Sequence, residues 1–389
     1  MGIRFAYLAE DKLFLQDGDS PARPVDSPFA QGVIEREVRD RQRNEWKTQG
    51  ANAAFGRGLP PWAMRADDAG TRRVFFTGLT AGTGQLLYAL STGPVGGLFV
   101  HSLADGTERR LFHRNGFRAR DLSCRADDGT VALSLQGEDG TANLAIIDAG
   151  GRGVREVTEG DSVDQAPAWT PGDKRRLVFQ SAGIGRNRLG HAAALGPYAV
   201  QQLDLEGGEI TTLLEADRTD YLCPKVGADG SLYCIRRPYR SALAPVNPLR
   251  VLLDVLLFPF RLVRAFVHFF NFFSVMFSGK PLLTAGGPAA QPNDRRHLML
   301  WGKMIDAEKA LRTAKNGDAP SLVPSDWELL CRGVDGTERV LARGVLSFDL
   351  SGDRIVYTNG SAVFELSPGG KSRQLCKGKM IEHIVVAKV

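Results

Sequence analysis

The chain repeats one short pattern six times, and this repeat limits its possible folds more than any other feature. Each copy is an apolar strand, a turn that contains glycine, and a second strand that begins near a basic residue. The copies occupy 12–26, 97–113, 142–158, 198–214, 327–343 and 362–377. Alternating apolar residues on both sides of an Asp-Gly or Gly-Gly turn are typical of a β-hairpin. Six similar hairpins predict an architecture of repeated β units.

A second pattern precedes most of these hairpins and supplies two more strands to each unit. It is a polar turn with glycine or aspartate, followed by three to five strand-forming residues, and its copies occupy 60–78, 121–136, 166–181, 221–237 and 346–360. A sixth copy is divided between the chain ends, because 380–389 provides one strand and 3–10 provides the next. We therefore expect an all-β fold, a six-bladed β-propeller closed by the N- and C-terminal strands. Such closure removes exposed sheet edges.

The length of the chain agrees with this fold. The chain has 389 residues, and two segments, 27–58 and 243–326, interrupt the repeats. Without them, about 45 residues remain for each blade, close to the ~40–45 residues of common propeller repeats. A β-sandwich with coincidental hairpins is the alternative, but it does not explain six copies in register. We expect a single domain over 1–389, with 27–58 as an inter-blade helical insertion and 243–326 as an insertion in blade five.

The most specific motif lies in the fourth unit, where Pro167-Ala168-Trp169-Thr170-Pro171-Gly172-Asp173 precedes the apolar Leu177-Val178-Phe179. This segment resembles the TolB-like (PD40 or WD40-like) propeller repeat, whose pattern is Pro-x-Trp-Ser-Pro-Asp-Gly before an apolar strand. The same repeat occurs in the propellers of prolyl-oligopeptidase-type peptidases. Weaker copies are Pro61-Trp62 and Ser351-Gly352-Asp353. The resemblance implies a propeller fold over nearly the whole chain outside the two interruptions.

The resemblance implies no activity. TolB proteins are periplasmic, with a signal peptide and an additional N-terminal α/β domain, and we identify neither in this sequence. The peptidases carry a hydrolase domain, and the chain contains no GxSxG nucleophile motif. Because propellers host many unrelated functions, function has to be argued from particular residues.

Charge and cysteine usage limit the compartment and the partners. The net charge of +5 is too weakly basic to predict nucleic-acid binding. The N-terminus has no long apolar run of the kind found in signal peptides. The five cysteines have no metal-ligand spacing and predict free thiols in a reducing compartment: Cys124, Cys223, Cys234, Cys331 and Cys376. We therefore expect a cytoplasmic protein.

The long connections are expected on one face of the ring. In an antiparallel four-stranded blade, the connection between strands two and three emerges on the same face as the connection to the next blade. Segment 243–326 is the first kind of connection and 27–58 is the second. Segments 79–96 and 182–197 are interpreted as further connections between strands two and three. Long loops on a rigid scaffold are where function tends to lie, so we expect the functional surface on this face.

The most informative insertion contains the segment 249–278, which holds eight of the twenty phenylalanines. A transmembrane helix is disfavoured, because Arg261 and Arg264 would lie near the bilayer centre at roughly 2.5–3.5 kcal/mol each. A helical wheel predicts instead an amphipathic helix with a wide apolar face and a narrow basic strip, suited to the surface of a membrane. Pro259 is expected to kink it. The predicted membrane-binding residues are Leu252, Val255, Leu256, Phe258, Phe260, Phe266, Phe269, Phe270, Phe273 and Phe277.

Basic residues around this helix predict a collar for lipid headgroups. The predicted headgroup-binding residues are Arg236, Arg237, Arg240, Arg250, Arg261 and Arg264. The expected partner is the anionic inner face of the cytoplasmic membrane. An apolar protein partner or internal packing of the helix is the alternative, because a wheel does not distinguish lipid from apolar protein. Segments 31–47 and 303–315 are predicted to form two further helices, either solvated or bound to a partner.

No catalytic constellation, metal site or cofactor motif is visible. The six histidines have no HxH or HxxxH spacing, and the glycine-rich stretches fit neither a phosphate loop nor a dinucleotide fingerprint. The sequence therefore favours a non-enzymatic scaffold that binds a membrane through 249–278 and an unknown cytoplasmic protein through its other surfaces. The alternative is an enzyme of the propeller hydrolase or lactonase class, with the insert as a substrate lid.

Overall fold

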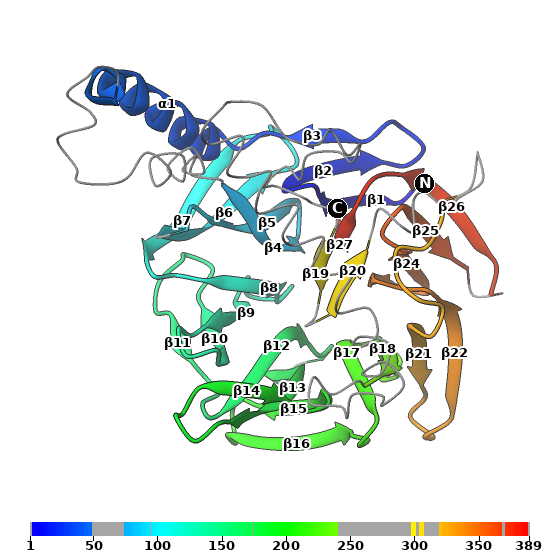
Figure 1. Cartoon of the computed structure of the whole chain (residues 1–389). Coiled ribbons are helices and arrows are strands. Elements are labelled where there is room, and N and C mark those ends of the chain that lie inside the picture. Colours follow the sequence, from blue (N-terminus) through cyan, green and yellow to red (C-terminus); the bar gives the residue numbers. More distant parts are fainter. Residues whose placement is uncertain are drawn as a thin grey trace, which may run out of the picture.

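The computed structural model describes residues 2–48, 74–93, 95–172, 174–239, 297–300, 303–306, 319–367 and 370–387. Strands make up most of these residues, and α1 (Pro28–Thr48) is the only helix among them. The prediction of an all-β chain is confirmed. The predicted helix 249–278 lies outside the described residues. Sheets are arranged around a common centre in the view of Figure 1.

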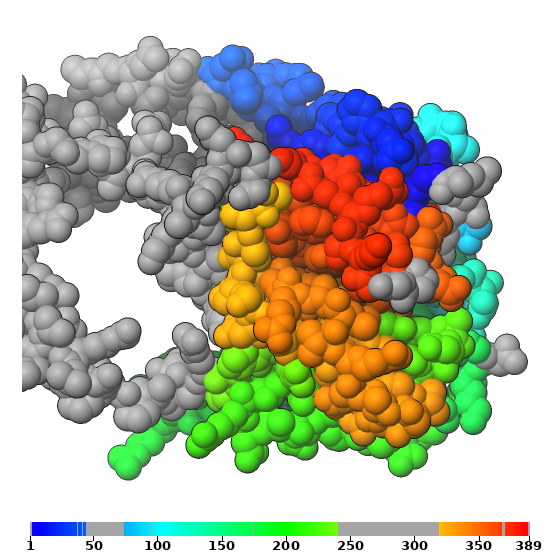
Figure 2. Space-filling model, turned by 90° about the vertical axis from the view of Figure 1, so that its right-hand side faces the viewer, coloured from blue at the N-terminus to red at the C-terminus, as the bar shows by residue number. Residues whose placement is uncertain are grey.

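One sheet contains both ends of the chain. Its strand order is β27-β1-β2-β3, and it consists of Ile381–Val386 (β27), Arg4–Ala9 (β1), Lys12–Asp17 (β2) and Arg23–Val25 (β3). The strand β27 pairs antiparallel with β1, from Phe5 opposite Val386 to Ala9 opposite Ile381. In Figure 2 the N-terminal surface (blue) and the C-terminal surface (red) lie directly against each other. The two ends of the chain therefore complete one sheet, as the divided repeat predicts.

The next sheets follow in chain order. One consists of Phe75–Gly82 (β4), Gln85–Ser91 (β5), Val95–Ser102 (β6) and Glu108–Asn115 (β7). The following unit is Ala119–Cys124 (β8), Val131–Gln136 (β9), Ala142–Ile147 (β10) and Arg155–Glu156 (β11). It joins the unit of Ser162–Trp169 (β12), Arg176–Arg186 (β13), Ala192–Leu195 (β14), Ala199–Asp204 (β15) and Glu209–Leu214 (β16). A single parallel pairing, Ala142 opposite Val163, connects these two units.

Two more four-stranded sheets and one hairpin complete the described chain. One sheet consists of Thr219–Val226 (β17), Leu232–Pro238 (β18), Glu328–Arg332 (β21) and Glu338–Arg343 (β22). The other consists of Ser347–Ser351 (β23), Arg354–Thr358 (β24), Ala362–Leu366 (β25) and Ser372–Lys377 (β26). The strands His297–Leu300 (β19) and Lys303–Asp306 (β20) form a separate hairpin between β18 and β21.

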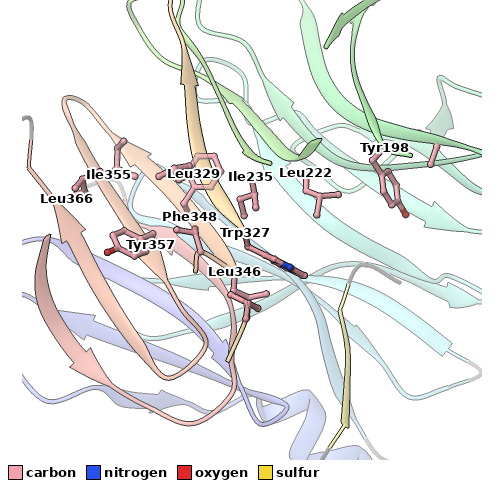
Figure 3. Close-up of a cluster of buried hydrophobic side chains, with 13 residues drawn as sticks. Tyr198, Leu222, Ile235, Trp327, Leu329, Leu346, Phe348, Ile355, Tyr357 and Leu366 are labelled. Carbon is pink, nitrogen blue, oxygen red and sulfur yellow. The ribbon is translucent and has the colours of Figure 1, made fainter. Parts of the chain in front are cut away.

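Burial explains the order of strands within each sheet. Middle strands such as β9 (VALSLQ) are apolar and almost fully buried, whereas last strands such as β7 (ERRLFHRN) are charged and mostly exposed. Charged last strands protect a sheet edge from pairing with other chains. Apolar side chains fill the space between neighbouring sheets, as around the fully buried Trp327, Leu329 and Phe348 (Figure 3). The core therefore lies between sheets, around the central axis.

The helix α1 connects β3 to β4 and covers the segment 31–47 that the sequence predicts to be helical. It begins after Ser27, whose hydroxyl accepts a hydrogen bond from the Ala30 amide (3.2 Å), as an N-cap residue does. Pro28 occupies the first helical position, where its missing N–H is not needed. The helix packs on the second sheet through Phe29, whose ring centroid lies 4.8 Å from that of Phe99 in β6.

Two sequence-based predictions are wrong in detail. The first hairpin of the second sheet was predicted within 60–78, but it spans β4 and β5, so 79–96 is not a connection between strands two and three. A tight turn at Gly84 (φ +65°) joins these strands. Gly78 and Gly82 lie close to it, so the sequence does not show which glycine forms the turn. The second correction concerns the predicted helix 303–315, whose first residues form the strand β20 and pair with β19.

Candidate functional site

The strands that line the centre are irregular. The pairings of β4, β8, β12, β17 and β27 with their neighbours each contain a register shift. Each such bulge inserts an extra residue, so the side chains no longer alternate regularly between the two faces of the sheet. Bulges are common beside binding sites. Three adjacent strands place a non-glycine residue at positive φ within the bulge: Asp121 (49°), Ala166 (50°) and Cys223 (51°). A strained backbone at the same place in three strands marks the centre as the candidate site.

Two cavities occupy this centre. The first, of about 430 Å³, is lined by the C-terminal parts of the innermost strands, including Trp169, Lys225 and Asp349. The second, of about 650 Å³, is lined by the N-terminal parts, including Arg120 and Glu382. Asp121 and His383 line both cavities. We therefore treat the two cavities as the halves of one central channel, with Asp121 and His383 where they meet.

Asp121 has an unusual environment for a carboxyl group. Its Oδ2 atom is buried and has no hydrogen-bond partner among the described residues. Burial raises the pKa of Asp121 to about 6, although Arg120 and the backbone amide of Ala166 act in the opposite direction. A buried carboxyl without full hydrogen bonding destabilises the fold at neutral pH. Its presence therefore points to a function of the channel.

His383 is neutral at physiological pH. Burial, and then the positive charge of Lys225, lower the pKa of His383 to about 4. Its Nε2 lies 3.1 Å from the carbonyl oxygen of Leu79. Because a carbonyl only accepts hydrogen bonds, the Nε2 atom carries the proton and donates it to Leu79. This bond joins the C-terminal strand β27 to the first strand of the next sheet, β4.

Two other titratable groups in the channel have raised pKa values. Burial raises the pKa of the Cys223 thiol to about 12, so this cysteine is protonated and unreactive. Burial, and then the negative charge of Asp11, raise the pKa of Glu382 to about 7. The channel therefore contains two carboxyl groups that titrate between about pH 6 and 7. Among the described residues, no group of three His, Cys, Asp or Glu side chains is placed to hold a metal ion.

Hydrogen bonds from side chains connect each sheet to the next around the channel. They begin on β4, follow the order of the sheets, and return to β4 through His383. The bonds join Thr77 to Ala119 (2.7 Å), Ser123 to Trp169 (3.2 Å), Gln180 to Cys223 (2.8 Å), Lys225 to Asp349 (2.6 Å), Asp349 to Val386 (2.7 Å) and His383 to Leu79 (3.1 Å). Polar bonds that cross every boundary hold the innermost strands in fixed positions.

The structure corrects the proposed basic collar. Arg237 is only 3% exposed, and its Nε donates to Asp220 Oδ2 at 2.8 Å. A buried, paired arginine does not reach a lipid headgroup, so this assignment is wrong. Arg236 is partly exposed but pairs with Glu328 (2.7 Å) and Glu338 (3.7 Å). The other predicted headgroup-binding residues, and all of the predicted membrane-binding apolar residues, lie outside the described part of the chain.

Arg237 instead helps to fix the base of the second insertion. The strand β18 leads into this insertion, and the guanidinium of Arg237 lies 4.7 Å from the ring centroid of Trp327, directly before β21. On the way in, the Tyr239 hydroxyl donates to the Leu195 carbonyl at 2.5 Å. On the way out, the Leu322 amide donates to the Asn359 carbonyl at 2.8 Å. Both ends of the insertion are therefore hydrogen-bonded to neighbouring parts of the fold.

Sequence reasoning did not identify Asp121, Glu382, His383 or Asp349. None of them belongs to a catalytic or metal-binding motif, because they come from three separate strands: Asp121 from β8, Asp349 from β23, and the neighbours Glu382 and His383 from β27. The only available signal is positional: each lies in the first strand of a repeat, and two of the three strained residues precede proline (Ala166-Pro167 and Cys223-Pro224). Within the described residues, no helix is long and apolar enough to cross a bilayer.

Comparison with known proteins agrees with the architecture. No protein-family model and no curated protein matches the sequence. Among solved structures, TolB from Acinetobacter baumannii matches 100% of this chain and 67% of its own chain, with a TM-score of 0.52 and 12% identity. A chain of the nidogen–laminin complex matches 99% of this chain and 98% of its own, with a TM-score of 0.51 and 9% identity.

The matched folds define a β-propeller protein. More particularly, the chain has a TolB-like propeller fold, as the motif at Pro167–Asp173 implies. Identities of this size show the fold alone, since propellers of one architecture carry unrelated functions.

Proposed function

We propose that this protein is a cytoplasmic scaffold, a closed six-bladed TolB-like propeller that binds the inner face of the cytoplasmic membrane through 249–278. The hydrogen bonds that pass from sheet to sheet and return to β4 support the closed ring. The long connections of such a ring present their residues on one face, and other surfaces remain for protein partners. In folds of this class, functional residues commonly lie on loops that a rigid scaffold positions.

One observation supports this proposal most strongly. The insertion that contains 249–278 leaves the ring at Arg237 and returns at Trp327, and these two side chains stack on each other. Asp220 neutralises the buried Arg237, so the base of the insertion is fixed by charge and by packing. A rigid base that carries a segment with eight phenylalanines is suited to presenting an apolar surface to a bilayer.

Vesicle sedimentation tests the proposal. The full-length protein and a variant without 246–290 are mixed with phosphatidylcholine vesicles and with vesicles that also contain phosphatidylglycerol, at low and high salt. We expect only the full-length protein to sediment with vesicles, and binding to persist at high salt because the apolar contribution exceeds the screened charge contribution. A full-length protein that does not bind either vesicle would overturn the membrane assignment.

Point variants separate the two faces of the predicted helix. Phe269→Ser with Phe273→Ser is expected to lower vesicle affinity by roughly tenfold or more, because each buried phenylalanine contributes about 1.5–3 kcal/mol. The matched control, Arg261→Gln with Arg264→Gln, is expected to remove only the part of the affinity that salt also removes. If the full-length protein is oligomeric and the deletion variant is monomeric, with no vesicle binding by either, the apolar face belongs to a protein interface.

The central channel favours one alternative function, an enzyme of the propeller hydrolase or lactonase class. The observation behind it is the carboxyl of Asp121, with its raised pKa, between two cavities. Such an enzyme is expected to hydrolyse esters or lactones and to lose this activity in the Asp121→Asn variant. Hydrolysis of a panel of simple lactones and aryl esters by the purified protein tests this alternative.

A further inference from the structure

The first cavity of the channel opens at the end of the innermost strands that lies away from the second insertion. Its lining includes Asp127 and Gly172, which belong to the turns that follow β8 and β12. It also includes Val226, the last residue of β17, directly before the turn to β18. Because β17 and β18 are antiparallel, this turn lies at one end of the sheet, and the insertion leaves β18 at the other end. The mouth of the cavity is therefore distant from the base of the insertion.

The cavity has the size and composition of a small-molecule site. Its volume of about 430 Å³ falls within the range of roughly 300–1,000 Å³ that ligand pockets have. Apolar side chains such as Leu122, Trp169 and Val385 form much of its wall. Asp121 and His383 lie at its inner end, where the two halves of the channel meet. An apolar wall with a few polar groups at defined positions is typical of a site for a small ligand.

The charged groups around Trp169, near the mouth of the cavity, neutralise one another. Arg125 pairs with Asp127 (3.2 Å) and with Asp128 (3.6 Å), and Arg175 pairs with Asp128 (3.7 Å). The guanidinium groups of the two arginines also lie 5.7 and 6.0 Å from the ring centroid of Trp169, and these contacts hold the indole in place. These two arginines and two aspartates therefore contribute no net charge to the site.

Deeper in the cavity, one carboxyl group has no such partner. Lys225 pairs with Asp349 at 2.6 Å, so this pair also contributes no net charge. His383 is neutral, because burial lowers its pKa to about 4. Among the described residues that line the cavity, one charge is therefore left unbalanced, the carboxylate of Asp121, whose buried Oδ2 atom has no hydrogen-bond partner. The adjacent Arg120 is exposed and lines the second cavity, not the first.

We propose that the first cavity binds a small organic ammonium ion, whose ammonium group donates a hydrogen bond to Asp121 and whose apolar part lies along the wall. An ammonium group supplies both the positive charge and the hydrogen-bond donor that this carboxylate lacks. A hydroxyl group supplies only the donor, and an anionic ligand is repelled. A bound cation also offsets the cost of burying a carboxylate without a partner. This inference does not depend on membrane binding by 249–278.

Fluorine NMR with the purified full-length protein at neutral pH tests this site. The probe is para-fluorobenzylamine, and para-fluorobenzyl alcohol is its neutral match. We expect the protein to broaden and shift the resonance of the amine and to leave that of the alcohol almost unchanged. In Asp121→Asn, the affinity for the amine is expected to fall roughly tenfold or more, because a charge-assisted hydrogen bond is lost. The control Asp353→Asn removes an exposed carboxylate outside the cavity lining and is expected to bind the amine as the wild type does.

Three other outcomes would overturn the inference. Equal binding of the amine and the alcohol would show that the cavity selects apolar volume and not positive charge. Undiminished binding of the amine by Asp121→Asn would place the probe at another carboxylate. No binding of the amine by the wild type at millimolar concentration would show that the cavity is not an ammonium site. Asp121→Asn removes an unfavourable buried charge, so it is expected to fold, and urea unfolding checks this. None of these outcomes affects the vesicle experiments, so the proposed function is tested separately.

Discussion

The guanidinium of Arg237 lies 4.7 Å from the ring centroid of Trp327 and pairs with Asp220, and all three side chains are at least 97% buried. This arrangement connects the two ends of the β17–β18 hairpin to the residue before β21, which is 90 positions further along the chain. An arginine is suited to this position because its planar, delocalised cation can stack on an indole and bind a carboxylate at the same time. It fixes both ends of the largest insertion.

The first prediction concerns this buried ion pair. Arg237→Met leaves the carboxylate of Asp220 buried without its cation, and removal of one partner of such a pair destabilises proteins by about 3–5 kcal/mol. Urea unfolding is expected to show a loss of this size. The double variant Arg237→Met with Asp220→Asn is expected to recover part of it, because no unpaired charge remains.

Arg236→Met, at a partly exposed pair, is the control and is expected to lose about 1 kcal/mol or less. Equal losses in Arg237→Met and Arg236→Met would contradict this account.

The second prediction concerns the response of His383 to acid. Its pKa is about 4 in the folded protein and 6.5 in an unfolded chain, so the unfolded state binds the proton more readily. The stabilising contribution of the neutral ring is therefore complete above about pH 6.5 and is lost as the pH falls toward 4. A shift of this size corresponds to about 3 kcal/mol. Glutamine can retain the hydrogen bond to Leu79, so His383→Gln is expected to remove this acid-dependent loss.

Urea unfolding at pH 7.5, 6, 5 and 4 measures this effect as the difference between variant and wild type. The free energy of unfolding of His383→Gln is expected to increase relative to that of the wild type as the pH falls. His113→Gln, at an exposed position of β7, is the matched control. If the difference in unfolding free energy between His383→Gln and the wild type stays constant over this range, the imidazole of His383 is not held neutral.

The third prediction is that Asp121→Asn stabilises the protein at neutral pH. The pKa of Asp121 is raised from 3.8 to about 6, so ionisation is less favourable in the folded state than in the unfolded chain. The folded state therefore loses stability as the pH rises from about 4 to 6, by about 2–3 kcal/mol in total. Asparagine does not ionise and avoids this loss.

The stability gain of Asp121→Asn over wild type is expected to be largest at pH 8 and to disappear below about pH 4. Asp353→Asn, at an exposed turn, provides the control. A variant that is less stable than wild type at every pH would show that the carboxyl of Asp121 is structural. Retention of a destabilising carboxyl agrees with a role in the channel, since functional sites often reduce stability.

Much of the fold could be predicted from the sequence because the repeat is visible in hairpins. Gly106, Gly129 and Gly336 lie in these turns at positive φ, a conformation that favours glycine. The glycines in the sequence therefore predict where the turns are. The first hairpin of the second sheet was misplaced because Gly78, Gly82 and Gly84 lie close together, and the sequence does not show that the turn is at Gly84. The channel residues could not be predicted, since Asp121 and His383 are 262 positions apart and only the folded chain brings them to the same cavities. Arg237 was assigned to the surface because Trp327, whose ring it stacks on, is 90 positions away in the sequence.

The last prediction concerns two glycines whose surroundings differ. A Cβ atom at Gly96, in the middle strand β6, would lie 1.8 Å from the carbonyl oxygen of Phe117, so the backbone would have to move. Gly96→Ala is therefore expected to destabilise the protein by about 1–3 kcal/mol or more. A Cβ atom at Gly32, in α1, would meet nothing within 4 Å. Gly32→Ala is expected to stabilise the helix by about 0.5–1 kcal/mol, because alanine loses less conformational entropy.

Urea unfolding measures the loss of stability in Gly96→Ala, and amide exchange within α1 measures the gain in Gly32→Ala. Similar behaviour of the two variants would contradict the close packing of β6 against the segment that leads to β8.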